Sequence, residues 1–176
     1  MILPTDIPEF GIKREDEERR DGGCAVVFDP ATQKYAVGKQ TNGFFRLFSG
    51  GVDENEDIQE GILREVVEEG GLHDFLHVEK IAEAFTHYRN TLRNVNRVAH
   101  ATCFLVILKS VHLVDVQHEE HETFSLHWAS AQEIMENWEA SNQNHDCDHW
   151  IYFFKKAVDR AKELGYDTTS GNVETW

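Results

Sequence analysis

Apolar and polar positions alternate along the chain in a way that predicts a β-sheet accompanied by helices. Short apolar runs bounded by turn residues are typical of strands. Such runs occupy residues 24–28, 34–37, 44–48, 78–85, 99–108 and 124–128. An Asp-Pro turn follows the first run, so the first two runs are expected to form a hairpin.

Three other segments have apolar residues three and four positions apart, which is the period of a helix. The first begins at Asp57, which has the spacing of a capping box with Glu60, and ends at a pair of glycines. Asp148 is the expected cap of the last helix. The segments cover about 57–70, 130–138 and 150–164. Strands and helices in this order predict an α/β fold with a mixed central sheet.

The chain has 176 residues, which is the size of one domain with short flanking segments. We expect a domain at 21–165, preceded by an N-terminal segment at 1–20 and followed by a C-terminal tail at 166–176. Acidic residues number 32 and basic residues 17, so the net charge is −15. This charge argues against broad binding to nucleic acid or to an anionic membrane, and it is compatible with a cation partner.

The sequence predicts a cytoplasmic protein. It has no apolar run of eighteen residues, and residues 1–6 do not resemble the start of a signal peptide. Its three cysteines, Cys24, Cys103 and Cys147, are odd in number and widely spaced, as is usual for reduced thiols. The oligomeric state stays open, a homodimer included.

Carboxylates are concentrated in the first predicted helix. Glu65, Glu68 and Glu69 are three and four residues apart, so they share one face, where like charges repel. This repulsion destabilises the helix. The three carboxylates could be oxygen ligands for Mg²⁺ or Mn²⁺, or they could form a solvated acidic surface. A glycine-rich loop at 49–56 precedes the helix, and such a loop lets backbone approach a phosphate or a metal closely.

Together, loop and helix read as Gly50, five residues, Glu56, seven residues, and then Arg64-Glu65-Val66-Val67-Glu68-Glu69-Gly70-Gly71-Leu72. This string resembles the complete signature of the Nudix hydrolases, at residues 50–72. The resemblance implies an α/β/α sandwich and a hydrolase that cleaves a diphosphate linkage in a nucleoside diphosphate linked to another group. It also implies a requirement for Mg²⁺ or Mn²⁺.

Carried over by position, the resemblance assigns roles to the residues of the signature. Glu68 and Glu69 would be metal ligands, Glu65 a ligand or the general base, and the carbonyl of Ser49 a further ligand. Gly50 and Glu56 would brace the loop, and Arg64 would support the catalytic carboxylates.

Some members of the family place a further acidic residue in a late loop, as ligand or base. Here Glu120 and Glu122 are the candidates, and an ordinary solvated loop is the alternative.

A local group of basic residues follows the signature. The stretch 88–97 contains three arginines and no acid, which is unusual in so acidic a chain. It could grip phosphates and stack a base, or it could be a polar connection between strands. The predicted substrate-binding residues are Tyr88, Arg89, Arg93, Arg97 and, in the run at 44–48, Arg46.

The nature of the substrate depends on weaker signals. Tyr88 lies sixteen residues beyond the signature, where Nudix enzymes acting on dinucleoside polyphosphates often have a tyrosine. We therefore expect a small nucleotide as partner, and favour dinucleoside polyphosphates. The alternatives are a nucleoside triphosphate or nucleotide-sugar pyrophosphatase, and a catalytically silent nucleotide-sensing module on the same fold.

Overall fold

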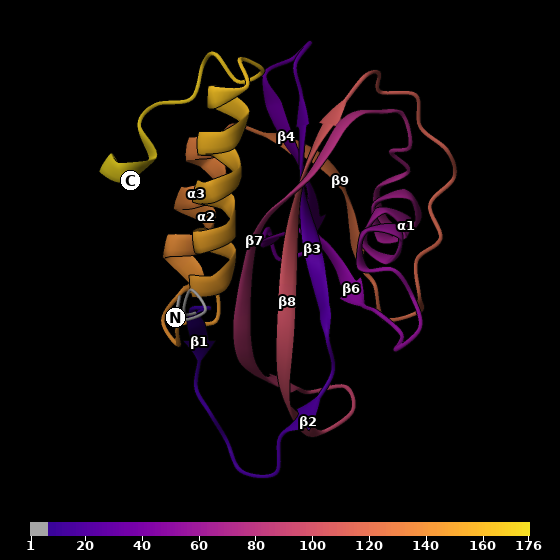
Figure 1. The fold of residues 1–176 in the computed structure, drawn as a ribbon, viewed down its shortest axis with the longest axis vertical. Helices are drawn as coiled ribbons and strands as arrows, with labels where there is room; N and C mark the ends of the chain where they lie inside the picture. Colours follow the sequence, from indigo (N-terminus) through magenta and orange to yellow (C-terminus); the bar gives the residue numbers. More distant parts are fainter. Residues whose placement is uncertain (1–6) are drawn as a thin grey trace, which may run out of the picture.

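A mixed β-sheet lies between helix α1 (Ile58–Gly70) on one face and helices α2 (Ala131–Ser141) and α3 (Asp148–Glu163) on the other (Figure 1). A short 3-10 helix, η1 (Val173–Thr175), lies near the end of the chain. The structure is a computed structural model that describes residues 7–176. The prediction that the chain does not begin with a signal peptide concerns residues 1–6, which lie outside this range. The layers confirm the predicted α/β/α sandwich.

The strands of the described chain form one sheet in the order β1-β7-β8-β3-β4-β5, with β2 beside β8, β6 beside β3 and β9 beside β4. Strand β3 runs parallel to β8 and antiparallel to β4, so the sheet is mixed, as predicted. The strands are β1 (Glu9–Gly11), β2 (Glu18–Arg19), β3 (Gly22–Asp29), β4 (Lys34–Gln40), β5 (Phe45–Arg46), β6 (Phe48–Gly51), β7 (Phe75–Asn90), β8 (Val95–Leu108) and β9 (Phe124–Ala129).

The central strand β3 separates two hydrophobic cores. Successive side chains of a strand point to opposite faces, so Val26 and Phe28 pack under α2 and α3, whereas Ala25 and Val27 pack under α1. Burial on both faces explains why this strand is a continuous apolar run. Its first half pairs with β6, which places the glycine-rich loop beside the middle of the sheet.

Helix α1 begins and ends where the sequence predicts. Asp57 is the N-cap, and its side chain accepts a hydrogen bond from the backbone N–H of Glu60. Gly71 closes the helix with a φ of 71°, and a Cβ there would lie 2.4 Å from the carbonyl oxygen of Val114. The buried face of the helix contains Ile62 and Val66 and also Glu69, so a carboxyl group points toward the sheet.

The structure differs from the sequence predictions where polar residues form strands. Strands β7 and β8 reach Asn90 and Val95, so the arginine-rich stretch is the end of a long hairpin. Strands β1 and β2 were not predicted, because their few residues are mostly exposed and charged and have no alternating pattern. Asp148 does not cap α3: it is the first residue of the helix, and Cys147 at the cap position makes no side-chain bond.

Both flanking segments contact the sandwich. Strands β1 and β2 pair with β7 and β8. At the other end the buried Asp167 accepts a hydrogen bond of 2.7 Å from the hydroxyl of Tyr35, and Val173 is part of the core. The boundaries 21–165 remain a prediction.

The three helices α1–α3 are too short and too polar to span a bilayer, and no other segment of residues 7–176 forms a helix that could do so.

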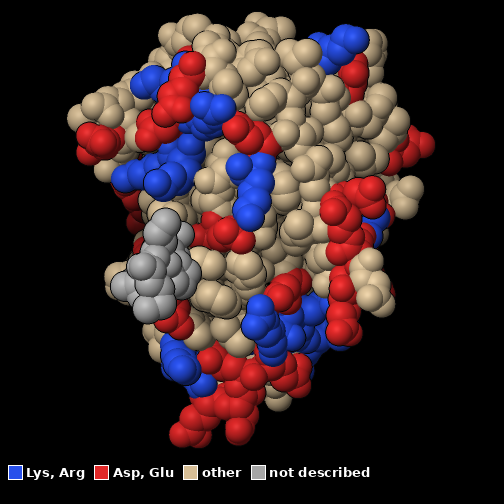
Figure 2. Space-filling view, viewed as in Figure 1, with Lys and Arg blue, Asp and Glu red and all other residues tan. Residues whose placement is uncertain are grey.

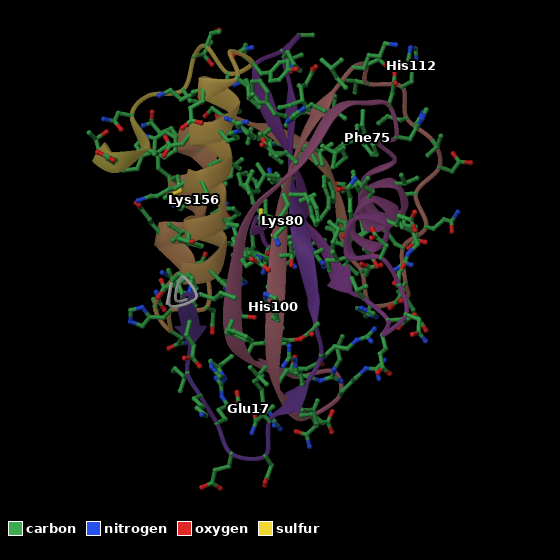
Figure 3. All side chains as sticks on the ribbon, in the orientation of Figure 1. Glu17, Phe75, Lys80, His100, His112 and Lys156 are labelled. Atoms are coloured by element: carbon green, nitrogen blue, oxygen red, sulfur yellow. The ribbon has the colours of Figure 1, made fainter. Side chains whose placement is uncertain are left out.

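A buried histidine holds the N-terminal segment against β7. The side chain of His87 is 4% exposed, and its two ring nitrogens lie 2.5 Å from Glu9 and 2.7 Å from Glu17. Figure 3 shows Glu17 in the loop between β1 and β2. Although burial alone would lower it, the pKa of His87 is raised, because both carboxylates stabilise the imidazolium ion. Only the protonated ring can donate to both of them.

We expect this contact to weaken as the pH rises from 6 to 9. A pKa raised above 6.5 in the folded state contributes stability that is complete below 6.5 and is lost as pH rises through the folded-state value. The free energy of unfolding should fall over this range by about 1.5 kcal/mol more in the wild type than in His87→Gln. Urea denaturation at each pH measures the difference, and parallel curves for the two proteins would refute the role of His87.

Candidate metal and phosphate site

Helix α1 and strand β6 meet at the carboxyl group of Glu69. This side chain is 1% exposed, and its two oxygens accept hydrogen bonds from the backbone N–H of Ser49, at 2.8 Å, and from Arg46, at 3.2 Å. Glu65 and Glu68 lie on the same helix, with side chains 18% and 35% exposed. The helix therefore presents one buried and two partly exposed carboxylates toward the glycine-rich loop.

The late loop between β8 and β9 adds one acidic residue to this group. Glu122 is partly buried and lies close enough to Glu69 to raise the pKa of that carboxyl group, whereas Glu120 is exposed. The backbone N–H of Glu119 donates to Glu122 at 2.8 Å and fixes its position. Of the two predicted late-loop acids, the structure thus brings Glu122 to the site and leaves Glu120 at the surface.

Burial and like charge shift the pKa values of these carboxyl groups. The pKa of Glu69 is raised to about 9, mainly by burial and also by Glu122, against the opposing effects of Arg46 and Ser49. Burial likewise raises the pKa of Glu65. The pKa of Glu122 is lowered in spite of its burial, because it accepts the hydrogen bond from Glu69. Without a further positive charge, burial and the neighbouring carboxylate therefore disfavour the ionised form of Glu69.

The remaining residues of the signature brace this arrangement. Arg64 is paired with Glu56 in the loop and also lies 3.4 Å from Glu65 and 3.7 Å from Glu68. A Cβ on Gly50 would lie 2.5 Å from a carboxylate oxygen of Glu65, so a side chain there would displace this carboxylate. The loop backbone and the carboxylates of α1 are consequently in direct contact.

The donor groups suit a divalent cation. Within residues 7–176 no three acidic or histidine side chains already form a coordination cage. However, the buried carboxyl group of Glu69 lies with those of Glu65 and Glu122, which are partly buried, and Arg46 faces Glu69. Carboxylate and carbonyl oxygens are the ligands that Mg²⁺ and Mn²⁺ prefer, and a cation would add the positive charge that stabilises these carboxylates in their ionised form.

A cleft of about 790 Å³ opens on the other side of the loop. Its floor is the backbone of β3 and β8, and residues 49–51 form one wall. Arginines line much of the cleft, and no acidic side chain of the described residues does so. Aromatic residues at the start of α3 close one end. The arginines are Arg20, Arg46, Arg93 and Arg97, and the α3 residues are His149, Trp150 and Phe153.

Most of the predicted substrate-binding residues lie in this cleft. Tyr88, Arg93, Arg97 and Arg46 line it. Arg89 does not line the cleft. Its neighbour Tyr88 points into the cleft, whereas the side chain of Arg89 donates hydrogen bonds to Asn94 and, at 3.0 Å, to Asn96. Alternation along β7 separates Arg89 from Tyr88 and from Arg97, which is paired with Tyr88 across the hairpin.

Four cleft residues were missed from the sequence. Arg20 was assigned to the N-terminal segment, and nothing local distinguishes it from its charged neighbours. His149, Trp150 and Phe153 lie about eighty residues after the end of the signature. The sequence did contain one signal for the aromatic residues: the polar stretch before α3 leads directly into them. Phe44 stacks on Trp150, with ring centroids 5.8 Å apart, so the aromatic end is held in place.

Several known proteins resemble this chain. A family model described as NUDIX domain matches residues 18–151. Among curated proteins, Nudix hydrolase 7 of Arabidopsis thaliana is 29% identical to the chain over 130 residues. The match covers 69% of this chain and 43% of that protein, so the chain spans less than half the length of this relative.

One solved structure shows the same fold, and a second is similar to part of the chain. The NUDIX domain of Shewanella oneidensis NrtR, crystallised with ADP ribose, matches with a TM-score of 0.52 and 16% identity, over 68% of this chain and 78% of that one. A NUDIX hydrolase from Nitrosomonas europaea matches with a TM-score of 0.47 and 20% identity, over 69% and 79% of the two chains.

Proposed function

The chain belongs to the Nudix hydrolase family, and we propose that it hydrolyses a diphosphate linkage in a nucleoside diphosphate linked to another group. One observation carries the proposal. The carboxylates of α1 and the arginine-lined cleft meet at Arg46 and Ser49, which line the cleft and donate hydrogen bonds to the buried Glu69. A substrate in the cleft would therefore present its phosphates beside the carboxylates.

Glu65, Glu68 and Glu69, with the carbonyl of Ser49, would hold Mg²⁺ or Mn²⁺. A bound cation of this kind neutralises phosphate charge and lowers the pKa of water. Arg64 and Glu56 keep the carboxylates and the loop in place. Glu65 and Glu122 are the groups available to accept a proton from the attacking water. Glu122 is the better supported of the two late-loop candidates, because Glu120 is exposed.

We further propose dinucleoside polyphosphates as the substrate class. Four arginines in a cleft without acidic side chains, among the described residues, favour a substrate with several negative charges. The aromatic end at Trp150 and the exposed Tyr88 offer surfaces on which two separate bases could stack. Three free, buried cysteines support the cytoplasm as location.

ADP-ribose is the second candidate. The NrtR domain was crystallised with this molecule, and it too contains a diphosphate linkage. It carries fewer charges than a dinucleoside polyphosphate, so the four arginines favour it less. Nucleoside triphosphates, nucleotide sugars and a silent sensing role remain as further alternatives.

A product assay separates these functions. The wild-type chain is incubated with Mg²⁺ or Mn²⁺ and with diadenosine tetraphosphate, ATP, ADP-ribose or a nucleotide sugar, and products are separated by anion exchange. We expect cleavage at a diphosphate bond, the highest kcat/KM for the tetraphosphate, and loss of turnover in Glu68→Gln. Higher kcat/KM for ADP-ribose would overturn the substrate class, and binding without turnover would favour the sensing role.

A further inference from the structure

Two consecutive glycines separate the carboxylates from an arginine. A Cβ on Gly50 would lie 2.5 Å from Glu65, and one on Gly51 would lie 2.6 Å from Nε of Arg20. Neighbouring side-chain directions in a strand point to opposite faces, so the two charged groups approach the backbone of β6 from opposite sides. Consecutive Cα atoms are about 3.8 Å apart, which keeps the guanidinium and the carboxylate within about 12 Å of each other.

Arg20 has a fixed backbone and a loosely held side chain. Its N–H donates to the carbonyl of Val98 at 3.0 Å, and the next residue accepts a 3.0 Å bond from Val52. Its guanidinium reaches Asp53 only at 3.3 and 3.4 Å. The two side chains are 42% and 79% exposed, and exposed pairs of this kind are weak. A phosphate can therefore take the place of Asp53 without loss of a strong interaction.

Two more arginines of the hairpin line the same cleft. The side chain of Arg97 is 11% exposed, and its buried Nε lies 3.7 Å from the exposed carboxylate of Glu18 without a hydrogen-bond partner in the described part of the chain. Burial raises the pKa of Tyr88, while the charges of Arg97 and Arg20 oppose this rise, so both guanidinium groups lie near its hydroxyl. In Figure 2, basic side chains gather near β2 and the lower part of β8, beside acidic ones.

We propose that Arg20, Arg93 and Arg97 form a second anion subsite, which binds a phosphate beyond the linkage that is cleaved. Arg46 is paired with the buried Glu69, so it serves the carboxylate site, whereas the acidic partners of Arg20 and Arg97, Asp53 and Glu18, are exposed and can give way to a phosphate. The subsite makes the enzyme select substrates by the length of that chain. This inference rests on the proposed function of the cleft as the nucleotide site.

Two variants remove the Arg20 contact in different ways. Arg20→Gln deletes the charge. Gly51→Ala keeps the charge but places a methyl group against the guanidinium, which is the end of a flexible side chain and can swing away. The φ of Gly51 is not in the left-handed region, so alanine fits the backbone. If the proposal holds, the effect of Gly51→Ala disappears when Arg20→Gln is already present.

The kinetic test compares diadenosine tri-, tetra- and pentaphosphate with ADP-ribose. Either variant should raise KM about tenfold for the tetra- and pentaphosphate, and less than twofold for ADP-ribose, with kcat nearly unchanged. Lys156→Gln is the matched control, because it removes one positive charge from an exposed position on α3 (Figure 3). Equal effects on all four substrates would overturn selection by chain length.

A binding measurement separates this inference from the proposed function. Calorimetry with inorganic tripolyphosphate needs no turnover, and the wild type and Lys156→Gln should bind it about tenfold more tightly than Arg20→Gln. A chain that hydrolyses nothing but shows this difference keeps the subsite and loses the proposed function. Affinities within twofold of each other in all three proteins would overturn the subsite, whatever the hydrolytic activity.

Discussion

Glu65→Gln is expected to lower kcat for the preferred substrate about a thousandfold. The carboxylate of Glu65 packs against the loop at Gly50 and is supported by Arg64 at 3.4 Å. As a ligand or a general base, it supplies charge that an amide cannot. Loss of a metal contact at the reacting phosphates costs several kcal/mol of transition-state stabilisation. A thousandfold decrease in kcat corresponds to about 4 kcal/mol.

The matched control for Glu65→Gln is Glu60→Gln, an exposed change in the first turn of the same helix. It removes the same charge and should leave kcat within twofold of the wild type. Steady-state kinetics at saturating Mg²⁺ measures both variants. A Glu65→Gln enzyme that retains more than a tenth of the wild-type kcat would contradict the role given to this carboxylate.

Trp138→Ala is expected to lower the free energy of unfolding by about 3–5 kcal/mol. Trp138 on α2 is fully buried and donates a hydrogen bond of 2.8 Å from its indole N–H to the carbonyl of Phe45. It also packs on Trp150, with ring centroids 5.7 Å apart, and so supports the aromatic end of the cleft. Since the free energy of unfolding of a domain is about 5–15 kcal/mol in total, this variant should be barely stable.

Trp138→Phe separates the two contributions, because it keeps most of the ring but leaves the carbonyl of Phe45 without its partner. Trp138→Phe should lower the free energy of unfolding by less, about 1–3 kcal/mol. Urea denaturation followed by circular dichroism gives both values. A decrease below about 1 kcal/mol for Trp138→Ala would show that α2 contributes little to the core.

The local parts of the site could be predicted from the sequence. Residues 50–72 are contiguous, and helical spacing alone puts Glu65, Glu68 and Glu69 on one face next to the loop. The cap at Asp57 and the end at Gly71 follow from local hydrogen bonding and backbone conformation. The signature at residues 50–72 therefore predicts both the helix and the metal-binding chemistry of its carboxylates.

Contacts between distant segments could not be predicted. Whether Glu120 or Glu122 meets Glu69 depends on how the late loop crosses the end of α1, and no periodicity encodes that crossing. Arg20 enters the cleft because β2 pairs with β8 and because Gly51 leaves room for its guanidinium. Arg89 and Arg97 look equivalent in the sequence, but strand geometry directs only Arg97 into the cleft.

The central claim is that the carboxylates of α1 bind a divalent cation beside a phosphate cleft. The most direct test is a titration with Mn²⁺ followed by electron paramagnetic resonance, on the wild type, Glu68→Gln and Glu60→Gln. We predict that Glu68→Gln binds Mn²⁺ at least tenfold more weakly than the other two proteins, which should be equal. Equal affinities in all three proteins would contradict the account, because the ion would then be bound elsewhere.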